Sequence, residues 1–330
     1  MSVDQDSGGA ARIVEVATGY MAAKQLFAAS ELGLFAALAS GPASADDLAR
    51  RTGLPVRTVR ILADAMSGLG LLTRADGVYA NTPSAARYLA GAEGELDLRP
   101  FLTFLEAVSY PHWLGFGASA RTGEPVPLDL EGERMEVFLT GVMTYNALHA
   151  RTLAAHYDFT PHRRALDLGG LSGAFLAEAM KAAPGLRGTF CAEGDLAAFA
   201  KRTLDEAGVG DRAELAAADP FTADLPADYD LVLLEHVVHR FGPERNVRHA
   251  ERARELAAPG ATLLLLDFFL DADPAQRVVD ALHAAEYLVI DGTTVYPEQE
   301  VRGWLAGAGW EPGPTLSLPG CPRVIVAYAR

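Results

Sequence analysis

The sequence predicts an α/β fold in two parts, a mainly helical N-terminal domain and a C-terminal doubly wound, Rossmann-like sheet. The chain has 330 residues, which is too long for one ordinary core and a comfortable length for two domains. Half of its residues are hydrophobic and 22% are charged, a balance typical of globular proteins. From Arg164 onward the apolar pattern changes from helical spacing to short runs that alternate with helical stretches.

The N-terminal domain is predicted to hold three helices followed by a β-hairpin. Apolar residues recur at helical spacing from Ile13 to Leu38, and a second helix opens at Ala45. A third helix follows Leu54, and the pair Asp76-Gly77 between short β-prone runs predicts the hairpin. Three helices with such a hairpin form a winged-helix arrangement.

The C-terminal domain is predicted to contain a parallel sheet, because its strands alternate with helices. Such a sheet binds ligands at the carboxyl ends of its strands, near the point where strand order reverses. The strand candidates are Ala165–Leu168, Arg187–Cys191, Ala213–Ala216, Tyr229–Leu234, Thr262–Leu266 and Arg323–Tyr328.

These patterns predict four segments. They are a small, polar, disordered tail at residues 1–10, a winged-helix domain at 11–95, a helical linker and substrate-pocket region at 96–160, and the Rossmann-like domain at 161–330.

The charge balance excludes some classes of partner. Forty-three acidic and 28 basic residues give a formal charge of −15, which repels nucleic acid and anionic membrane surfaces. The third helix offers only Arg57 and Arg60, so we interpret the winged helix as an interaction or dimerisation module. A DNA-binding regulator with a ligand-sensing domain is the interpretation that this charge opposes.

Membrane insertion and disulfide bonding are not expected. No run approaches the roughly 18 apolar residues of a membrane span, and no secretory signal pattern opens the chain, so we expect a cytoplasmic protein. Cys191 and Cys321 are the only cysteines and form no CxxC pair. Neither a disulfide framework nor a thiolate metal site is therefore predicted.

A glycine-rich turn is the predicted cofactor loop. Asp167-Leu-Gly-Gly-Leu-Ser-Gly173 ends the first strand and runs into a helix, which lets a ligand approach the backbone at the helix N-terminus. Leu171 stands where the dinucleotide fingerprint has its second glycine, so a nicotinamide cofactor is not favoured. The alternative is a tight strand-to-helix connection without a ligand.

This loop, together with the segments around His239 and after Val295, resembles the small-molecule O-methyltransferases, which include plant caffeate-type and bacterial polyketide-tailoring enzymes. The resemblance covers nearly the whole chain, because the winged helix, the aromatic-rich linker and the α/β domain follow in the family's order. It implies S-adenosylmethionine as cofactor and a homodimer formed through the winged helix. It also implies O-methylation of a hydrophobic small molecule in secondary metabolism, such as antibiotic biosynthesis.

The resemblance assigns the residues that bind this cofactor. A carboxylate suits the ribose because its oxygens accept bonds from adjacent hydroxyls. Glu193 is our choice for that role, since Ala192 stands at the position aligned with the family's acid. The cofactor-binding candidates are Asp167, Gly169, Gly170 and Gly173 for the methionine part, Glu193 for the ribose, and Asp219 and Phe221 for the adenine.

The same resemblance makes His239 the general base. Histidine suits that role because its ordinary pKa near 6.5 lets it accept a proton at neutral pH. Glu298 falls where the family has a carboxylate that orients this histidine. The alternative is that Glu298 is a first-turn acid that favours the helix dipole.

The acceptor is expected to meet a helical face and a second histidine. Met143, Asn146 and His149 are spaced three apart, which places them on one side of a helix that the family directs at substrate. Packing explains Met143 equally well. His236 completes the substrate candidates.

A metal could be held by His236 and His239 with Glu235 and His283 nearby. We expect none, because His-x-x-His pairs also arise without metal.

Three residues depart from the family's pattern. Arg240 stands where the family usually has aspartate, Leu171 replaces a loop glycine, and Ala192 replaces the ribose acid. These departures motivate an alternative function, in which a methyltransferase-fold enzyme catalyses a rearrangement, cyclisation or hydroxylation instead of methylation.

Overall fold

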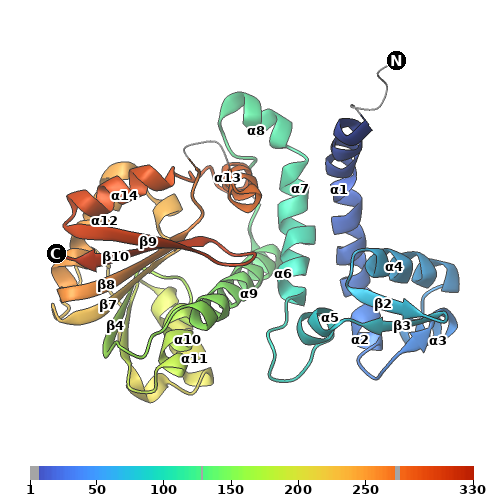
Figure 1. Ribbon diagram of the computed structural model, residues 1–330, viewed down its shortest axis with the longest axis horizontal. Helices are drawn as coiled ribbons and strands as arrows, with labels where there is room; N and C mark the ends of the chain where they lie inside the picture. The colour runs from blue at the N-terminus through green and yellow to red at the C-terminus, as the bar shows by residue number, and fades with distance from the viewer. Residues whose placement is uncertain (1–6, 128, 272–275) are drawn as a thin grey trace. The chain divides into compact units, whose positions relative to one another are not determined.

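The structure is a computed structural model that describes residues 7–127, 129–271 and 276–330. The chain divides into two compact units (Figure 1). The first comprises Met1–Pro111 and Leu130–Thr144, and the second comprises His112–Asp129 and Tyr145–Arg330. Among the described helices, none is both long and apolar enough to cross a membrane.

The first unit has the helices and small sheet of a winged helix. Its sheet has the strand order β1-β3-β2. The elements in chain order are α1 (Ser7–Glu31), α2 (Leu34–Ala37), β1 (Ala43–Ser44), α3 (Ala45–Thr52), α4 (Val56–Gly68), β2 (Leu72–Ala75), β3 (Val78–Asn81), α5 (Pro83–Tyr88) and α6 (Arg99–Phe104), followed by a π-helical segment, Leu105–Ser109.

Local sequence explains the turns of this unit. Asp76 and Gly77 both have positive φ, 50° and 78°, as a two-residue turn between twisted strands requires. The Ser44 side chain accepts a bond from the Asp47 backbone N–H and completes a capping box at the start of α3.

Two predictions for this unit were wrong in detail. The helix predicted from Ile13 to Leu38 is interrupted, because Gly33 adopts a left-handed φ of 74° and starts the separate helix α2. A disordered tail was predicted at residues 1–10. Residues 1–6 of this range lie outside the described residues, and residues 7–10 belong to the start of α1.

The segment that follows the winged helix along the chain and precedes the first strand of the large sheet is mainly helical, as the sequence predicted. The elements are α7 (Tyr110–Trp113), α8 (Phe116–Thr122) and the long helix α9 (Gly132–His156).

The second unit is built on a seven-stranded sheet of order β6-β5-β4-β7-β8-β10-β9. The neighbouring strands β6, β5, β4, β7 and β8 pair in parallel. Strand β10 is antiparallel to both β8 and β9. The order reverses between β4 and β7. The strands are β4 (Arg164–Leu168), β5 (Arg187–Cys191), β6 (Ala213–Ala216), β7 (Tyr229–Glu235), β8 (Ala257–Asp267), β9 (Trp310–Ser317) and β10 (Arg323–Ala329).

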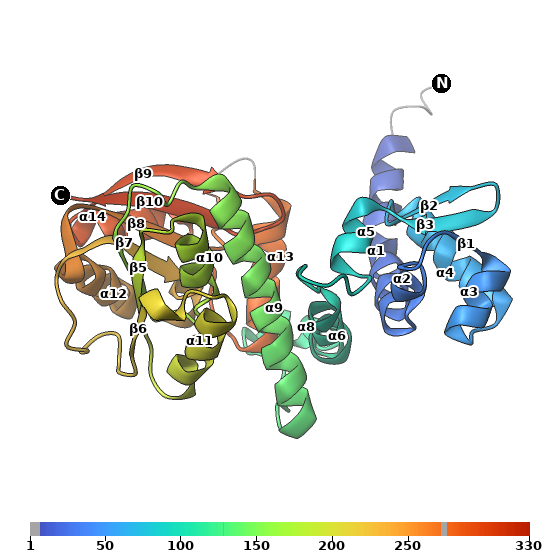
Figure 2. The same ribbon diagram turned by 90° about the horizontal axis from the view of Figure 1, so that it is seen from below.

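Helices cover both faces of this sheet, as Figure 2 shows for α10 and α11 on one side and α12 on the other. Alternate strand residues enter two separate cores: Leu231 and Leu233 pack with α10, whereas Val232 and Leu234 pack with α12. The helices are α10 (Ala174–Ala182), α11 (Asp195–Glu206), α12 (Pro243–Leu256), α13 (Val278–Ile290) and α14 (Glu298–Gly307).

The six predicted strands are all present, and β9 was missed. Its sequence, Trp310 to Ser317, contains Pro312, Gly313 and Pro314, which are unusual in a strand. Proline is tolerated there because β9 is the edge strand and pairs only with β10.

Candidate functional site

The candidate site lies at the carboxyl ends of the central strands, where strand order reverses. β4 ends in the glycine-rich loop, β7 ends at Glu235 and is followed by His236 and His239, and β8 ends at Asp267. Because these strands are parallel, their carboxyl ends meet at one edge of the sheet.

The glycine-rich loop has a backbone that only glycine adopts without strain. Gly169 has a φ of 86°, and Gly173 has a φ of 67° and precedes α10 as its N-cap. The Gly170 N–H donates to Asp167 Oδ1 at 3.1 Å. A Cβ on Gly170 would lie 2.4 Å from that oxygen, so the loop backbone sits directly on the carboxylate.

A pair of carboxyl groups is buried under this loop. Asp167 is 0% exposed and Glu235 is 4% exposed, and both would be within 3.0 Å of a Cβ on Gly170. Burial and the neighbouring Glu235 raise the pKa of Asp167, and burial raises the pKa of Glu235. The pair therefore favours holding a proton, which relieves the repulsion between two buried charges.

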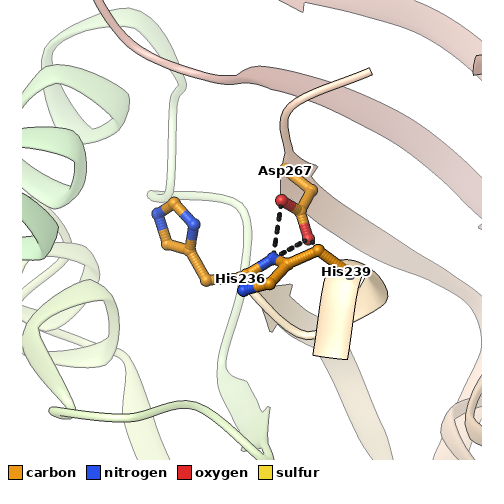
Figure 3. Close-up of side chains that lie close together, drawn as sticks. All are labelled: His236, His239 and Asp267. Atoms are coloured by element: carbon orange, nitrogen blue, oxygen red, sulfur yellow. Dashed lines mark hydrogen bonds and ion pairs between the residues drawn. The ribbon is translucent and has the colours of Figure 1, made fainter. Parts of the chain in front are cut away.

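His239 is held by Asp267, as Figure 3 shows. Its Nδ1 lies 3.0 Å from both Oδ1 and Oδ2 of Asp267. The same carboxylate accepts backbone N–H bonds from Val238 at 3.1 Å, from His239 at 3.3 Å and from Phe268 at 2.9 Å. One buried carboxylate thus orients both the imidazole and the backbone that carries it.

These contacts set the proton positions. Burial raises the pKa of Asp267, but the neighbouring imidazoles of His239 and His236 and the hydrogen bonds from His239 and the Phe268 N–H outweigh burial, so the pKa is lowered. An ionised carboxylate only accepts, so Nδ1 of His239 carries the hydrogen and Nε2 keeps its lone pair. The ring also stacks on Tyr287, with centroids 4.2 Å apart.

His236 has an unusual backbone and a buried partner. Its φ of 54° is left-handed, a conformation that is uncommon for residues other than glycine and is concentrated at functional sites. Its Nε2 lies 3.0 Å from Nδ1 of His149, a fully buried residue of α9. Burial lowers the pKa of His236 to about 3 and that of His149 well below its ordinary value, so both rings are neutral.

An aromatic group continues from this pair. The Nδ1–H of His283 donates to the Val279 carbonyl at 2.8 Å, so its Nε2 accepts from the Tyr145 hydroxyl at 3.3 Å. His283 stacks on Phe268 with centroids 3.8 Å apart. Burial raises the pKa of Tyr145, which keeps its hydroxyl protonated. The rings of His149, His236, His283 and Tyr145 therefore form an aromatic group that carries no charge of its own.

The carboxylate of Glu298 contacts Thr315, Arg302 and Arg323. Its carboxylate accepts from Thr315 and is paired with Arg302 at 3.4 Å and Arg323 at 3.1 Å. Those contacts use both of its oxygens, and Asp267 lies beside His239. The physical reason is the register of β10, which aligns Arg323 with Asp267 and brings a cation to Glu298.

The remaining predicted residues fall into three places. Glu193 is exposed and follows β5 by two residues. Asp219 and Phe221 follow β6, where Asp219 Oδ1 accepts from the Phe221 N–H at 3.0 Å and the Phe221 ring packs against His249. Asn146 is buried on α9, one turn before His149, and Met143 precedes it in the first unit.

His236, His239 and Asp267 also form a group whose ligand atoms lie within 4.8 Å of one another and could hold a metal ion. Figure 3 shows the His236 ring directed away from the Asp267 carboxylate, which is bonded to His239. The expectation of no metal stays a prediction.

Comparisons with known proteins agree along the chain. A profile described as "O-methyltransferase dimerisation domain" matches residues 14–91, and one described as "O-methyltransferase domain" matches residues 115–311. A 3-hydroxy-5-methyl-1-naphthoate 3-O-methyltransferase of Streptomyces sahachiroi is 34% identical over 305 residues, covering 90% of this chain and 88% of the relative. The chain belongs to the O-methyltransferase family.

Two further similarities extend this result. An acetylserotonin O-methyltransferase of Mus musculus is 32% identical over 324 residues, covering 90% of this chain and 83% of the relative. The crystal structure of the S-adenosylmethionine-dependent methyltransferase SibL in its apo form superposes with a TM-score of 0.82 at 28% identity, covering 97% of this chain and 98% of that one. This O-methyltransferase therefore has the predicted fold.

Sequence reasoning did not single out Asp267 and Tyr287, which contact His239, or Tyr145, which is hydrogen-bonded to His283. A signal for Asp267 was available, since it directly follows the predicted strand Thr262–Leu266, and the carboxyl end of that strand faces the same edge as His239. The two tyrosines offered no local signal, because aromatic residues on helices usually serve packing.

Proposed function

We propose that this enzyme transfers a methyl group from S-adenosylmethionine to a hydroxyl of a hydrophobic small molecule in secondary metabolism, with His239 as general base. The observation that carries the proposal is the His239–Asp267 contact at 3.0 Å, which orients the ring and keeps the lone pair on Nε2. Relatives named as O-methyltransferases of a naphthoate and of acetylserotonin support this reaction class.

The residues present fit the cofactor. Gly169 and Gly173 open the loop at positive φ, and nothing larger than glycine fits at position 170 above Asp167. Glu193 offers an exposed carboxylate at the end of the neighbouring strand, and Phe221 offers a ring beside the loop after β6. When bound, S-adenosylmethionine supplies the methyl group on a positively charged sulfonium.

The chain's own residues supply the proton transfer. Nε2 of His239 accepts the hydroxyl proton of the acceptor, and the Asp267 carboxylate stabilises the positive charge that the ring then carries. General base catalysis of this kind contributes about 10²- to 10⁴-fold. Alignment of the two substrates and exclusion of water supply the rest.

The surroundings of the base favour an uncharged, aromatic acceptor. Tyr287 stacks on His239, and Phe268 stacks on His283, so the neighbouring surfaces are flat and apolar. His149 and His236 are neutral and can exchange hydrogen bonds with a polar substituent without a charge penalty. We therefore infer that this pair selects among acceptors by hydrogen bonding.

We also propose that the enzyme works as a homodimer through its first unit. Helix α1 exposes Ile13, Val14 and Val16 by 71%, 60% and 65%, three apolar side chains within about one turn, which favours a protein partner. The dimerisation profile matched at residues 14–91 covers this helix. Sedimentation measurements that give a single-chain mass at micromolar concentration would contradict this proposal.

Calorimetry and product mass test the main proposal. We expect S-adenosylmethionine and S-adenosylhomocysteine to bind the purified protein, and a phenolic acceptor to gain one methyl group. His239→Gln should still bind both ligands and lose about 10²-fold or more in turnover. A product of unchanged mass would favour a rearrangement instead, and unaltered turnover in the variant would remove His239 as base.

A further inference from the structure

Arg240 connects the segment that carries His239 to the cofactor loop. It ends the short 3-10 helix Val238–Arg240, and its Nη2 donates to the Gly169 carbonyl oxygen, 71 positions away in sequence. Gly169 is the first residue of the glycine-rich loop after β4. One side chain therefore ties the loop after β4 to the segment after β7.

The guanidinium is a buried cation among carboxyl groups. Burial lowers the pKa of Arg240, while Asp267, Glu235 and Asp167 raise it, so all three carboxyl groups lie within range of its charge. Arginine stays protonated in proteins, so the charge is permanent. Its Nε is buried without a hydrogen-bond partner in the part of the chain that the structure describes, so the contacts at this position do not satisfy the whole guanidinium.

Two of these three carboxyl groups, Asp167 and Glu235, carry about one negative charge between them, and the third, Asp267, is ionised. Asp167 and Glu235 face each other under Gly170 and favour sharing a proton, so together they offset about one positive charge. Arg240 supplies that charge. Another cation brought to the loop therefore meets the guanidinium, while the remaining negative charge, on Asp267, is hydrogen-bonded to His239 and to three backbone N–H groups.

Methyl transfer brings such a cation to this place. A donor held by the loop must present its methyl group to a hydroxyl that is bonded to His239, and Arg240 spans the interval between His239 and Gly169. The donor carries a positive sulfonium, whereas the demethylated product is uncharged at that sulfur. Arg240 thus opposes the donor more than the product.

We propose that Arg240 is a positioning residue for the cofactor loop and that its charge shifts binding toward S-adenosylhomocysteine relative to S-adenosylmethionine. The inference rests on the proposed function, since it takes this cofactor pair as the ligands of the loop. It is particular to this chain, because the aspartate usual in the resembled family would carry the opposite charge. The enzyme should accordingly be more sensitive to product inhibition with Arg240 than without its charge.

The test measures the dissociation constants of both ligands by calorimetry in the full-length wild-type protein, Arg240→Lys and Arg240→Gln. For Arg240→Gln we expect the ratio of the constant for S-adenosylmethionine to that for S-adenosylhomocysteine to fall about three- to tenfold, because a nearby charge is removed. For Arg240→Lys the charge stays, so both ligands should weaken together and the ratio should stay within about twofold of wild type.

A matched control separates this effect from net charge. Arg187→Gln removes the same charge at the start of β5, at the opposite edge of the sheet, from a side chain that is 59% exposed. Both constants should be unchanged there. Thermal unfolding of each variant verifies that it folds, and Arg240→Met provides a second uncharged variant if the glutamine variant does not.

The outcomes distinguish the two levels of inference. An unchanged ratio in a folded, uncharged variant, with both ligands bound by wild type, overturns the role of Arg240 and leaves the proposed function standing. Absence of binding of either ligand to wild type at millimolar concentration overturns the proposed function and this inference with it. A falling ratio in the folded uncharged variant, but not in Arg240→Lys, supports the proposal.

Discussion

Replacing Asp267 by asparagine removes a charge from the base while nearly preserving its shape. The carboxylate lies 3.0 Å from His239 Nδ1 through both oxygens, and it also accepts three backbone N–H groups, from Val238, His239 and Phe268. An amide keeps one acceptor oxygen and adds an NH₂ donor, which can favour the tautomer with hydrogen on Nε2. The imidazolium formed in the reaction loses its counter-charge.

The expected magnitude follows from that geometry. Opposite unit charges about 4 Å apart interact by about 4 kcal/mol at an effective dielectric constant of about 20. We therefore expect kcat to fall about 10²- to 10³-fold, with the affinity for S-adenosylmethionine nearly unchanged. The free energy of unfolding should fall by about 1–3 kcal/mol, because one of the bonded backbone N–H groups loses its acceptor.

Steady-state kinetics and chemical unfolding test this, with Asp230→Asn as the matched control. Asp230 accepts backbone N–H bonds from Arg163 at 2.8 Å and Arg164 at 3.0 Å at the opposite edge of the sheet. The control should lose stability without losing turnover. If Asp267→Asn retains kcat within threefold of wild type, Asp267 does not support the base and the proposed division of roles is refuted.

The pH dependence of stability provides an independent check on the same carboxylate. The lowered pKa of Asp267 means that its ionised form favours the folded state. This contribution to stability is complete above the pKa of the aspartate in the unfolded chain, near 3.9. It is lost as the pH falls through the lower pKa of Asp267 in the folded protein. The stability difference between wild type and Asp267→Asn should therefore shrink on acidification. A difference that grows below pH 4 would contradict the assignment.

Three further predictions follow from single contacts. Gly170→Ala should destabilise the fold by about 1–3 kcal/mol and weaken cofactor binding, because the new Cβ would lie 2.4 Å from a buried carboxylate oxygen. Gly185→Ala should be tolerated, because the nearest atom to its new Cβ would be 3.7 Å away. Chemical unfolding and calorimetry of the two variants test this difference. Glu235→Gln should gain stability relative to wild type as pH rises from 4 to 8, because burial raises the pKa of Glu235 and its ionised form opposes folding. Chemical denaturation of both proteins across that pH range measures the difference. A difference that does not change with pH would show that Glu235 is ionised without a cost to folding. Glu298→Gln should lower the melting temperature, because the ion pair of Glu298 with Arg323 at 3.1 Å is lost. The kcat should stay within about threefold of wild type. A larger loss of kcat would indicate that Glu298 acts as a partner of the base.

Local sequence was sufficient to predict much of the scaffold. The predicted strands of the sheet are present because apolar runs that alternate with helices have few other ways to bury both faces. The wing turn at Asp76-Gly77 and the loop from Gly169 to Gly173 follow from backbone angles that few residues adopt. The strand β9 was missed because its tolerance for proline depends on an edge position that no local pattern reveals.

The partners of the reactive groups were decided only by tertiary structure. His239 and Asp267 are 28 residues apart and meet because β7 and β8 are adjacent and parallel. Sequence assigned a similar role to Glu298, but the antiparallel β10 places Arg323 against it, and the contact to His239 in this structure comes from Asp267. The sequence by itself determined which residues could carry charge, protons and backbone turns, whereas strand order determined which of them meet, because pairing in a sheet joins segments without regard to their separation along the chain.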